Sequence, residues 1–235
     1  GVEDPGYPPV WRTLQAAGAE VVPLPVDGEG LRVDQLEAHL PLRALYLTPH
    51  HQFPTTATLS APRRLRLLEL ARRHRIAVLE DDYDFEFHFE GRAVLPLASG
   101  DEGGVVIYLG TLSKILAPGL RLGWVAGPRA VVEALGTLRR QVDVHGNRVM
   151  EGAVAAFIED GLLQRHARKM RRIYGERREV LLESLARHLP GDLTVVPTGG
   201  GLSVWARTSP DLDPEAWAAR AQAAGVLVMP GRRFD

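Results

Sequence analysis

The sequence predicts an α/β fold, and three features of residues 20–126 point to it. Short apolar runs that suit buried strands alternate with longer amphipathic runs that suit helices. The run at 76–79 is apolar at every position, as in a parallel strand buried on both faces. The runs at 105–109 and 122–126 are only about a dozen residues apart, which suits an antiparallel connection better than a parallel crossover. We therefore expect a mostly parallel sheet with one antiparallel strand and with helices on both faces.

The helices expected in the first half of the chain have recognisable starting residues. Asp34 and Ser60 suit N-cap positions, because their side-chain oxygens can accept a hydrogen bond from the first helical amides. In the helix after Ser60, Leu65, Leu68 and Ala71 or Arg72 are spaced along one side. The helices predicted here are residues 11–17, 34–40 and 62–74.

The strands expected in this half end in turns and loops. Asp27-Gly28-Glu29-Gly30 predicts a turn, and residues 49–56 predict a loop at the carboxyl end of the strand before it. The predicted strands are residues 20–24, 44–48, 76–79, 105–109 and 122–126.

The second half of the sequence is predicted to be mostly helical and to end in a small α+β part. Gly199-Gly200-Gly201 lacks the following helix and the Lys-Ser/Thr of a phosphate-binding loop, so we interpret it as a turn. The basic run at 165–172 is interpreted as a solvated helix face rather than a nucleic-acid surface. The predicted helices are residues 131–142, 149–158, 162–189 and 214–224, and the predicted strands are 193–197, 202–206 and 226–229.

Composition excludes several classes of function. The 235 residues carry a formal net charge of -1, so no overall basic field would hold a nucleic acid or an anionic membrane. Cysteine is absent, which excludes disulfides and thiolate metal sites and fits a cytoplasmic location. No apolar run approaches the roughly 20 residues of a membrane span, and no signal peptide is present. We expect both ends of the chain to be cuts through a larger protein.

Lys114 is the residue most indicative of chemistry. The sequence has 28 lysines and arginines, and reading along it shows that all are arginine except Lys114 and Lys169. Lys169 lies in the basic run, whereas Lys114 lies among hydroxyls, glycines and aliphatic residues, with no charged neighbour nearer than Arg121. A lysine amine can lose its proton when desolvated and attack a carbonyl to form a Schiff base, which a guanidinium cannot do.

Three features are predicted to meet at one edge of the sheet, beyond the carboxyl ends of the strands, where α/β folds bind ligands. They are the carboxylate pair Asp81-Asp82, the turn that carries Lys114, and an arginine seven residues later. Pyridoxal phosphate requires such a set, since a lysine holds its aldehyde and a carboxylate keeps its pyridine nitrogen protonated. Either Asp81 or Asp82 would be that carboxylate. The remaining candidate ligands are Thr111, Ser113 and Arg121 for the phosphate, and Tyr83 for the ring hydroxyl.

Each feature also has a simpler interpretation. The Asp81-Asp82 pair suits a magnesium site or a helix cap, Lys114 suits a structural turn, and Tyr83 suits a core position. The eight histidines show no metal-binding spacing and are interpreted as loop or surface residues, although His51 and Gln52 could reach a cofactor.

Four stretches together resemble a known family: residues 48–55, with His-Gln-Phe-Pro-Thr; 79–87, with Asp-Asp-Tyr-Asp; 110–124, around Lys114; and 165–178. The sequence is similar to the fold type I, pyridoxal-phosphate-dependent aminotransferases of class I/II. Within them it most resembles the aminotransferase-like domain of MocR-type GntR transcriptional regulators. The resemblance covers essentially all 235 residues.

The resemblance implies a role for each candidate residue and a division of the chain. Lys114 would be the Schiff-base lysine, Asp81 the partner of the pyridine nitrogen, and Tyr83 that of the ring hydroxyl. The phosphate ligands would be Thr111, Ser113 and Arg121. The fold would be aspartate-aminotransferase-like, with a large domain over residues 1–170, lacking its N-terminal part, and a truncated small α+β domain over 171–235. Such domains are homodimers with active sites at the subunit interface.

Two departures from the family bear on activity. Thr56 stands where the family has glycine after Pro-Thr, so the backbone of that loop is expected to differ. The segments that hold the family's phosphate-binding loop and its substrate-binding arginine are missing from this sequence. We therefore expect this stretch alone to bind pyridoxal phosphate weakly and not to catalyse transamination.

Three hypotheses of function follow. The first is an effector domain that senses an amino acid or amine and reaches DNA only through a domain absent from this chain. The second is an active aminotransferase that acts on an amino acid and a 2-oxo acid, with Lys114 as its general base. The third is a magnesium-dependent phosphoryl-transfer domain that uses Asp81 and Asp82.

Overall fold

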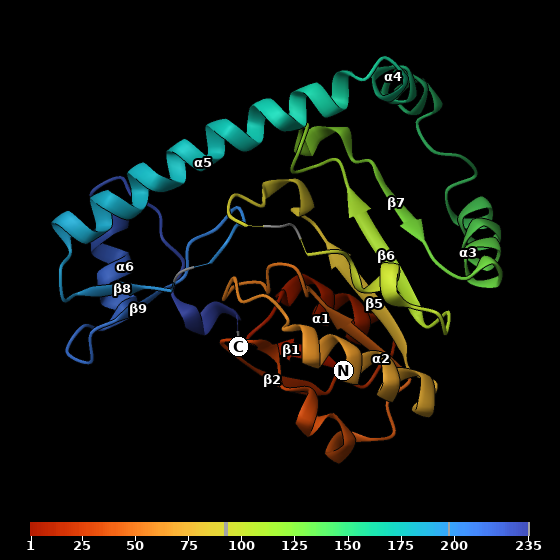
Figure 1. The fold of residues 1–235 in the computed structure, drawn as a ribbon, viewed down its shortest axis with the longest axis horizontal. Helices are drawn as coiled ribbons and strands as arrows, with labels where there is room; N and C mark the ends of the chain where they lie inside the picture. The colour runs from red at the N-terminus through yellow and green to blue at the C-terminus, as the bar shows by residue number, and fades with distance from the viewer. Residues whose placement is uncertain (92–93, 197, 235) are drawn as a thin grey trace.

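A seven-stranded sheet with the strand order β3-β2-β1-β4-β5-β6-β7 organises the N-terminal part of the chain (Figure 1). The computed structural model describes residues 1–91, 94–196 and 198–234. The strands β2, β1, β4, β5 and β6 run parallel to one another, and β7 pairs antiparallel with β6, as predicted. A two-residue strand, β3, adds a second antiparallel pair that the sequence analysis did not predict. The strands are β1 Val2–Asp4, β2 Pro23–Asp27, β3 Gly30–Leu31, β4 Ala44–Leu47, β5 Ala77–Asp82, β6 Val106–Thr111 and β7 Gly123–Ala126.

The helices of this part begin close to their predicted positions but differ in detail. Ser60 occupies the N-cap of α2, but its hydroxyl donates to Glu29 Oε2 and accepts no hydrogen bond from a helix amide, so the expected capping bond is not formed. The segment predicted as a helix at 34–40 is a 3₁₀ helix, and Asp34 lies inside it, bound to the side chain of Arg32. The elements are α1 Pro8–Ala16, α2 Ala61–His74, and the 3₁₀ helices η1 Val33–His39, η2 Phe85–Phe87, η3 Leu97–Gly100 and η4 Pro118–Leu120.

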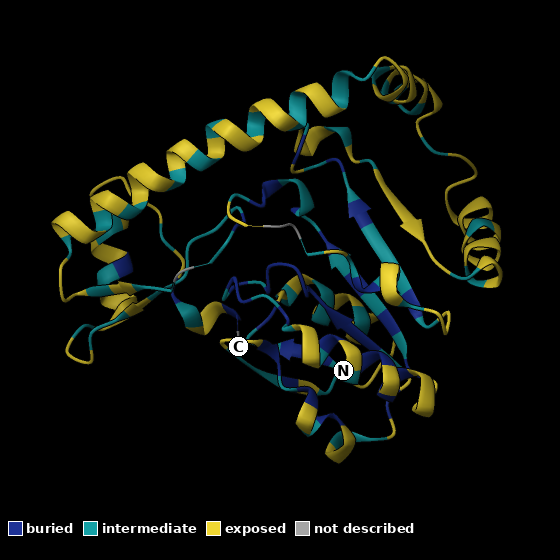
Figure 2. Cartoon of the chain, viewed as in Figure 1, coloured by how far each residue is buried: buried dark blue, intermediate teal, exposed yellow. Residues whose placement is uncertain are grey.

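The main core lies around the central strands and one face of α2, and Figure 2 shows this part of the sheet as buried. Leu67 of α2 is fully buried and packs in the same cluster as Leu45 and Val78 of the sheet. Of the residues predicted along one side of α2, Leu68 and Ala71 are buried, whereas Leu65 is 72% exposed. The buried face of α2 also includes Leu67 and Leu70, which were not among the predicted residues.

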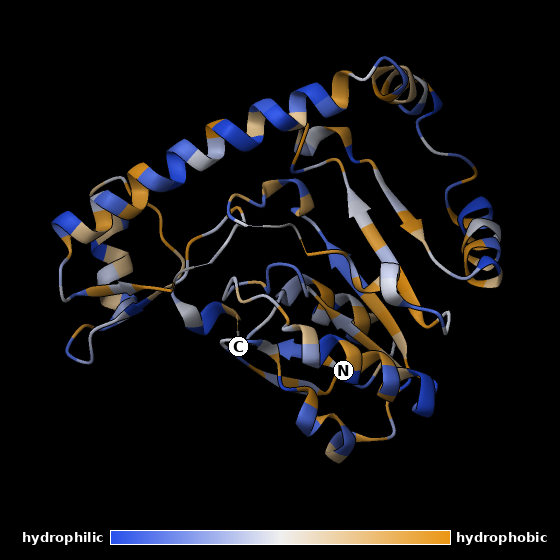
Figure 3. Ribbon diagram, viewed as in Figure 1, coloured by the Kyte–Doolittle hydropathy of each residue, from blue (hydrophilic) through white to orange (hydrophobic). Residues whose placement is uncertain are grey.

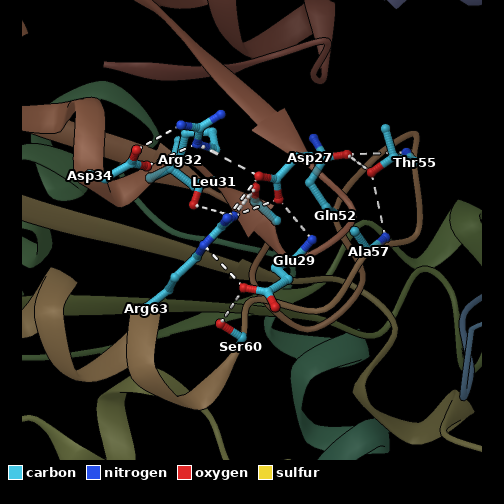
Figure 4. A network of polar contacts seen from close by, with 11 residues as sticks. Asp27, Glu29, Leu31, Arg32, Asp34, Gln52, Thr55, Ala57, Ser60 and Arg63 are labelled. Carbon is cyan, nitrogen blue, oxygen red and sulfur yellow. Dashed lines mark hydrogen bonds and ion pairs between the residues drawn. The ribbon is translucent and has the colours of Figure 1, made fainter.

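Arg63 ties α2 to the β2–β3 hairpin (Figure 4). Its Nη1 and Nη2 atoms donate to the two carboxylate oxygens of Asp27 at 2.6 and 2.7 Å, and Nη1 also donates to the carbonyls of Gly30 and Leu31. Such a two-pronged contact matches the fork of the guanidinium and fixes its orientation. It holds the predicted turn at 27–30 against the helix.

The C-terminal part is mainly helical, as predicted, and a long helix, α5, runs from α4 to the β8–β9 pair (Figure 1). The 27 residues of α5 give it a length of about 40 Å. Most of its surface is hydrophilic (Figure 3). The elements are α3 Arg129–Val142, α4 Arg148–Glu159, α5 Leu162–His188, β8 Leu193–Val195, β9 Ala206–Thr208, α6 Pro214–Ala223 and the 3₁₀ helix η5 Gly231–Phe234.

The strands of this part depart most from prediction. β8 pairs with β9, but β9 begins at Ala206, where the predicted strand at 202–206 ends. Residues 226–229 form no strand, so that prediction is wrong. Apolar residues form a strand only where a neighbouring strand can bond their backbone, and among the described residues the small sheet has two strands. The prediction for 193–197 extends to residue 197, which lies outside the described residues.

The end of the described chain returns to its beginning. The Phe234 carbonyl accepts a hydrogen bond from the Gly6 amide, and the Phe234 ring contacts Phe53 edge to face. Within residues 1–91, 94–196 and 198–234, no helix has the length and apolar character needed to cross a membrane.

Candidate functional site

The two carboxylates Asp81 and Asp82 lie on opposite faces of β5, because successive side chains of a strand alternate. Tyr46 of β4 donates a hydrogen bond to Asp81 Oδ2 at 2.5 Å. Tyr108 of β6 donates to Asp82 Oδ2 at 3.0 Å, and His50 Nδ1 lies 3.4 Å from the same oxygen. The two carboxylates therefore do not form one chelating pair, and the geometry gives no support to the magnesium hypothesis.

The turn that carries Lys114 begins directly after β6, the neighbour of β5. Asp82 pairs with Gly110 in the register of these strands, so the turn leaves the sheet beside the end of β5. The Ser113 amide donates to Thr111 Oγ1 at 3.1 Å, and the Leu116 amide donates to the Leu112 carbonyl. The turn is anchored because Leu112 and Ile115 are buried in the second core cluster, around Phe87.

The Lys114 side chain is exposed between these two buried anchors. The desolvation expected for its amine is therefore not provided by the described residues. A ring nitrogen of His166, on α5, lies 2.9 Å from the Ile115 carbonyl and connects the turn to the long helix.

Asp81 and Lys114 are close enough to interact electrostatically. Burial raises the pKa of Asp81 above its usual value, and the nearby charges of Asp82 and Asp84 raise it further. The hydrogen bond from Tyr46 and the ammonium of Lys114 act in the opposite direction and favour the carboxylate. The register of β5 and β6 pairs Asp81 with Leu109 and Asp82 with Gly110, so the turn of Lys114 leaves the sheet at the end of β5 that carries Asp81.

The predicted phosphate ligands lie next to Lys114. Thr111 pairs with Gly123 across β6 and β7, and the Leu112 amide donates to the Leu122 carbonyl, which brings Arg121 beside Ser113. The exposed Arg121 has a left-handed backbone, with φ of 52°. Two hydroxyl residues and one arginine therefore lie close together along the backbone of the turn, and hydroxyls and a guanidinium are donors that suit an anion.

Tyr83 follows the acidic pair, and its hydroxyl donates to the His51 carbonyl at 3.1 Å. Burial is the main cause that raises the pKa of Tyr83 well above its usual value, so the phenol stays protonated. The hydroxyl is thus held by the loop that follows β4, and its oxygen can still accept a hydrogen bond.

The loop after β4 is more enclosed than predicted. His50 and His51 lie in this loop, in keeping with their interpretation as loop or surface residues, but both are buried. His51 Nδ1 lies 2.7 Å from Asp84 Oδ1. The Gln52 side chain donates to the carbonyls of Pro5 and Phe53 and accepts from Thr55, within and around its own loop.

Thr56, at the departure from the family pattern, has φ of 63°. This is the left-handed conformation that glycine adopts readily and that a β-branched residue adopts at a cost. The loop therefore keeps a glycine-like backbone at this position, although the residue is threonine.

Tyr46 and Glu3 are two buried polar residues of this region that the sequence analysis did not single out. Glu3 Oε2 accepts hydrogen bonds from the Thr48 amide and hydroxyl, at 2.9 and 2.8 Å. Burial outweighs these bonds and raises the pKa of Glu3 to about 7. Tyr46 pairs with Leu79 and so shares a face with Asp81, two positions on. Sequence reasoning could have found Tyr46 only by treating β4 and β5 as neighbouring strands and aligning their residues.

Comparison with known proteins places the chain among aminotransferases and related regulators. The family described as "Aminotransferase class I and II" matches residues 2–235. The probable rhizopine catabolism regulatory protein MocR of Rhizobium meliloti is 35% identical over 234 residues, which are 99% of this chain and 47% of that protein. The aromatic-amino-acid aminotransferase 1 of Thermococcus litoralis is 34% identical, over 99% of this chain and 58% of that protein.

A solved structure agrees with these matches. The kynurenine aminotransferase of Pyrococcus horikoshii, solved in complex with PMP, superimposes with a TM-score of 0.91 at 30% identity, covering 99% of this chain and 60% of that one. The chain thus spans about half the length of the curated relatives it matches.

Proposed function

Since the chain belongs to the class I and II aminotransferase family, we propose that it is the pyridoxal-phosphate-binding effector part of a MocR-type transcriptional regulator. One observation carries the cofactor assignment: the register of β5 and β6 brings the turn of Lys114 to the end of the strand that carries Asp81. The similarity to MocR supports the regulatory role. The aspartate-aminotransferase-like fold agrees with both.

The residues at the edge of the sheet fit pyridoxal phosphate in kind. They include an amine, a carboxylate and a turn with hydroxyl and guanidinium donors, and each matches one functional group of the cofactor. Lys114 would hold the aldehyde as a Schiff base, and Asp81 would hold the pyridine nitrogen. Thr111, Ser113 and Arg121 would bind the phosphate, and Tyr83 the ring hydroxyl. When bound, the cofactor supplies an electron sink for a substrate amine.

The role proposed for Asp81 depends on the charge of its carboxylate. Asp81 can stabilise a protonated ring nitrogen only while it is ionised, and both Tyr46 and Lys114 favour that state against the effect of burial. Lys114 remains exposed, so further parts of the protein would be needed to exclude water from its amine. In line with this, we expect the 235 residues alone to bind the cofactor weakly.

The partners we propose follow from the same assignment. The ligand is an amino acid or an amine, which would exchange with Lys114 on the cofactor. DNA is contacted through a domain outside this chain, the parent acts in the cytoplasm, and the site is completed in a homodimer. The division into a large domain, 1–170, and a small domain, 171–235, is part of this proposal.

A second candidate function is an active aminotransferase. The 34% identity to the Thermococcus litoralis enzyme and the superposition on the Pyrococcus horikoshii enzyme favour it. In this case Lys114 also serves as the general base that moves the proton at the α-carbon of the substrate. Both functions need the same residues around the cofactor.

The first experiment tests the cofactor site in the full-length parent protein. Addition of pyridoxal phosphate is expected to give the near-visible absorbance of a Schiff base, and Lys114→Ala is expected to abolish it. Lys169→Ala is the matched control and should leave it unchanged. Reduction with borohydride followed by peptide mass spectrometry should find the label on Lys114. A label on Lys169, or none at all, would contradict the assignment.

The second experiment separates the two functions. The wild-type parent, loaded with cofactor, is tested for binding to its own promoter DNA and for transamination with a panel of amino acids and 2-oxo acids. Specific DNA binding that changes with an amino acid, without turnover, supports the regulator. Turnover without DNA binding supports the enzyme and contradicts the regulator.

A further inference from the structure

Two tyrosine–aspartate pairs flank β5, one on each face of the sheet. On one face, Tyr46 of β4 donates to Asp81; on the other, Tyr108 of β6 donates to Asp82. Both tyrosines come from strands next to β5, and both bond the Oδ2 atom of their aspartate. The pairs have the same chemistry but lie on opposite faces of the sheet, and the charge of Lys114 acts on Asp81.

The Tyr46 hydroxyl can act only as a donor toward Asp81. It is buried, with 6% of the residue exposed. Burial, together with the charge of Asp81, raises the pKa of Tyr46 far above its usual value. Tyr46 therefore keeps its proton and engages Oδ2, which leaves Oδ1 of Asp81 for a second donor.

Asp81 depends on this donor to remain ionised. Burial and the charges of Asp82 and Asp84 all raise its pKa, and the Tyr46 hydrogen bond is the first of the two influences that lower it. Glu3, a further buried carboxylate, is close enough for Asp81 to raise its pKa. Without Tyr46, Asp81 would take up a proton more readily, and a neutral acid does not balance a protonated ring nitrogen.

We propose that Tyr46 is a positioning residue for the nitrogen of the bound pyridine ring. It fixes the orientation of the Asp81 carboxylate and keeps it charged, so that Oδ1 faces the ring N–H. This inference rests on the proposed binding of pyridoxal phosphate and extends it to a residue that does not itself touch the cofactor. A hydrogen bond to a charged group is stronger than one between neutral groups, so its loss should be measurable.

The test compares Tyr46→Phe with Tyr108→Phe in the full-length protein. Each variant removes one hydroxyl and its hydrogen bond to an aspartate, from the buried Tyr46 or from the half-buried Tyr108, so the folding cost of each is measured separately. Tyr46→Phe is expected to raise the dissociation constant for pyridoxal phosphate by about tenfold or more, and Tyr108→Phe to leave it nearly unchanged. Circular dichroism and urea unfolding confirm that both variants fold.

A spectroscopic readout distinguishes positioning from a general loosening of the site. If Asp81 holds the ring proton less firmly, less positive charge remains near the Schiff base, and the pKa of its nitrogen rises. Titration of the absorbance against pH should therefore move to higher pH in Tyr46→Phe and stay in place in Tyr108→Phe. In an Asp81→Asn background, Tyr46→Phe should add little, because the group through which it acts is gone.

The outcomes separate this inference from the proposed function. If the wild type forms no Schiff base on Lys114, the proposed function itself fails. If it does, but Tyr46→Phe changes neither affinity nor the titration, the role of Tyr46 is refuted and the cofactor site stands. Equal losses in both tyrosine variants would also refute it, because the effect would then be one of folding.

Discussion

Asp81 and Asp82 are adjacent in the sequence but have different neighbours, because β5 turns them to opposite faces of the sheet. The spacing of residues alone restricted the candidate to these two, and it was the family resemblance that implied Asp81. The choice depends on which face meets the turn after β6, and this is a property of the register between strands. Tyr46 was missed for the same reason, since its role becomes visible only across the β4–β5 pair.

Glu3 gives a prediction at the level of one residue. Its pKa is raised from an ordinary 4.5 to about 7 in the folded protein, so the folded state binds a proton that the unfolded state releases over this range. Stability must then fall as the pH rises from about 4.5 to about 7. The full effect is of the order of 3 kcal/mol, at about 1.4 kcal/mol per pKa unit.

Glu3→Gln removes this titration and keeps an oxygen that can accept from Thr48. Urea unfolding of the two proteins should give similar stabilities below about pH 4.5 and a more stable variant above about pH 7. Taking the difference between the proteins cancels the histidines and other groups that titrate in both. Parallel curves of stability against pH would show that Glu3 is not buried in its neutral form.

Secondary structure elements were predictable where the local pattern and the long-range contacts agree. The strand at 76–79 is apolar because both of its faces are covered, and β5 begins at Ala77. By contrast, Leu65 and Leu67 are equally apolar, and only packing against the sheet decides that Leu67 is the buried one. The run at 226–229 looks like a strand by composition, but no described strand lies beside it.

The Gly199-Gly200-Gly201 segment, predicted as a turn, packs against the segment after β5. The Phe89 and Glu90 amides donate to the Gly199 carbonyl, and the Gly201 amide donates to the Phe87 carbonyl. A Cβ at Gly200 would lie 2.6 Å from the Phe87 carbonyl oxygen and 3.0 Å from the His88 Cα, which are backbone atoms that cannot move aside cheaply.

We therefore expect Gly200→Ala to destabilise the protein by about 1–3 kcal/mol, as overpacking does. Gly152→Ala is the control, because a Cβ there meets nothing within 4 Å and alanine favours a helix by up to about 1 kcal/mol. Urea unfolding of both variants measures the difference. A Gly200→Ala protein as stable as the wild type would show that the segment packs more loosely than in this structure.

The two halves of the chain differ in how many of their residues are buried. The N-terminal sheet holds the main core, whereas no residue of α3, α4 or α5 is buried among the described residues (Figure 2). On α3, Val132, Leu135, Leu138 and Val142 are exposed at helical spacing. The sequence predicted these helices from their periodicity, but periodicity does not show whether the same chain covers the apolar side.

The proposed homodimer would cover part of this side, and α3 offers a test. Leu138 is 55% exposed, so Leu138→Asp should cost little in the isolated chain and should weaken an interface that includes α3. In sedimentation velocity, the full-length Leu138→Asp protein is expected to shift from dimer toward monomer. Leu65→Asp, on the exposed side of α2, is the control and should leave the distribution unchanged. An unaltered dimer in Leu138→Asp would place the interface elsewhere.

The alternation along β5 also limits how this chain can change in length. Removing or adding one residue between Ala77 and Asp81 would turn each carboxylate to the opposite face of the sheet. Asp82, which contacts His50, would then face the side of Lys114, and Asp81 would face the other side. Removing or adding two residues would keep Asp81 on the same face of the sheet and only move its carboxylate along the strand. Descendants of this gene should therefore tolerate substitutions in β5 more readily than single-codon gaps.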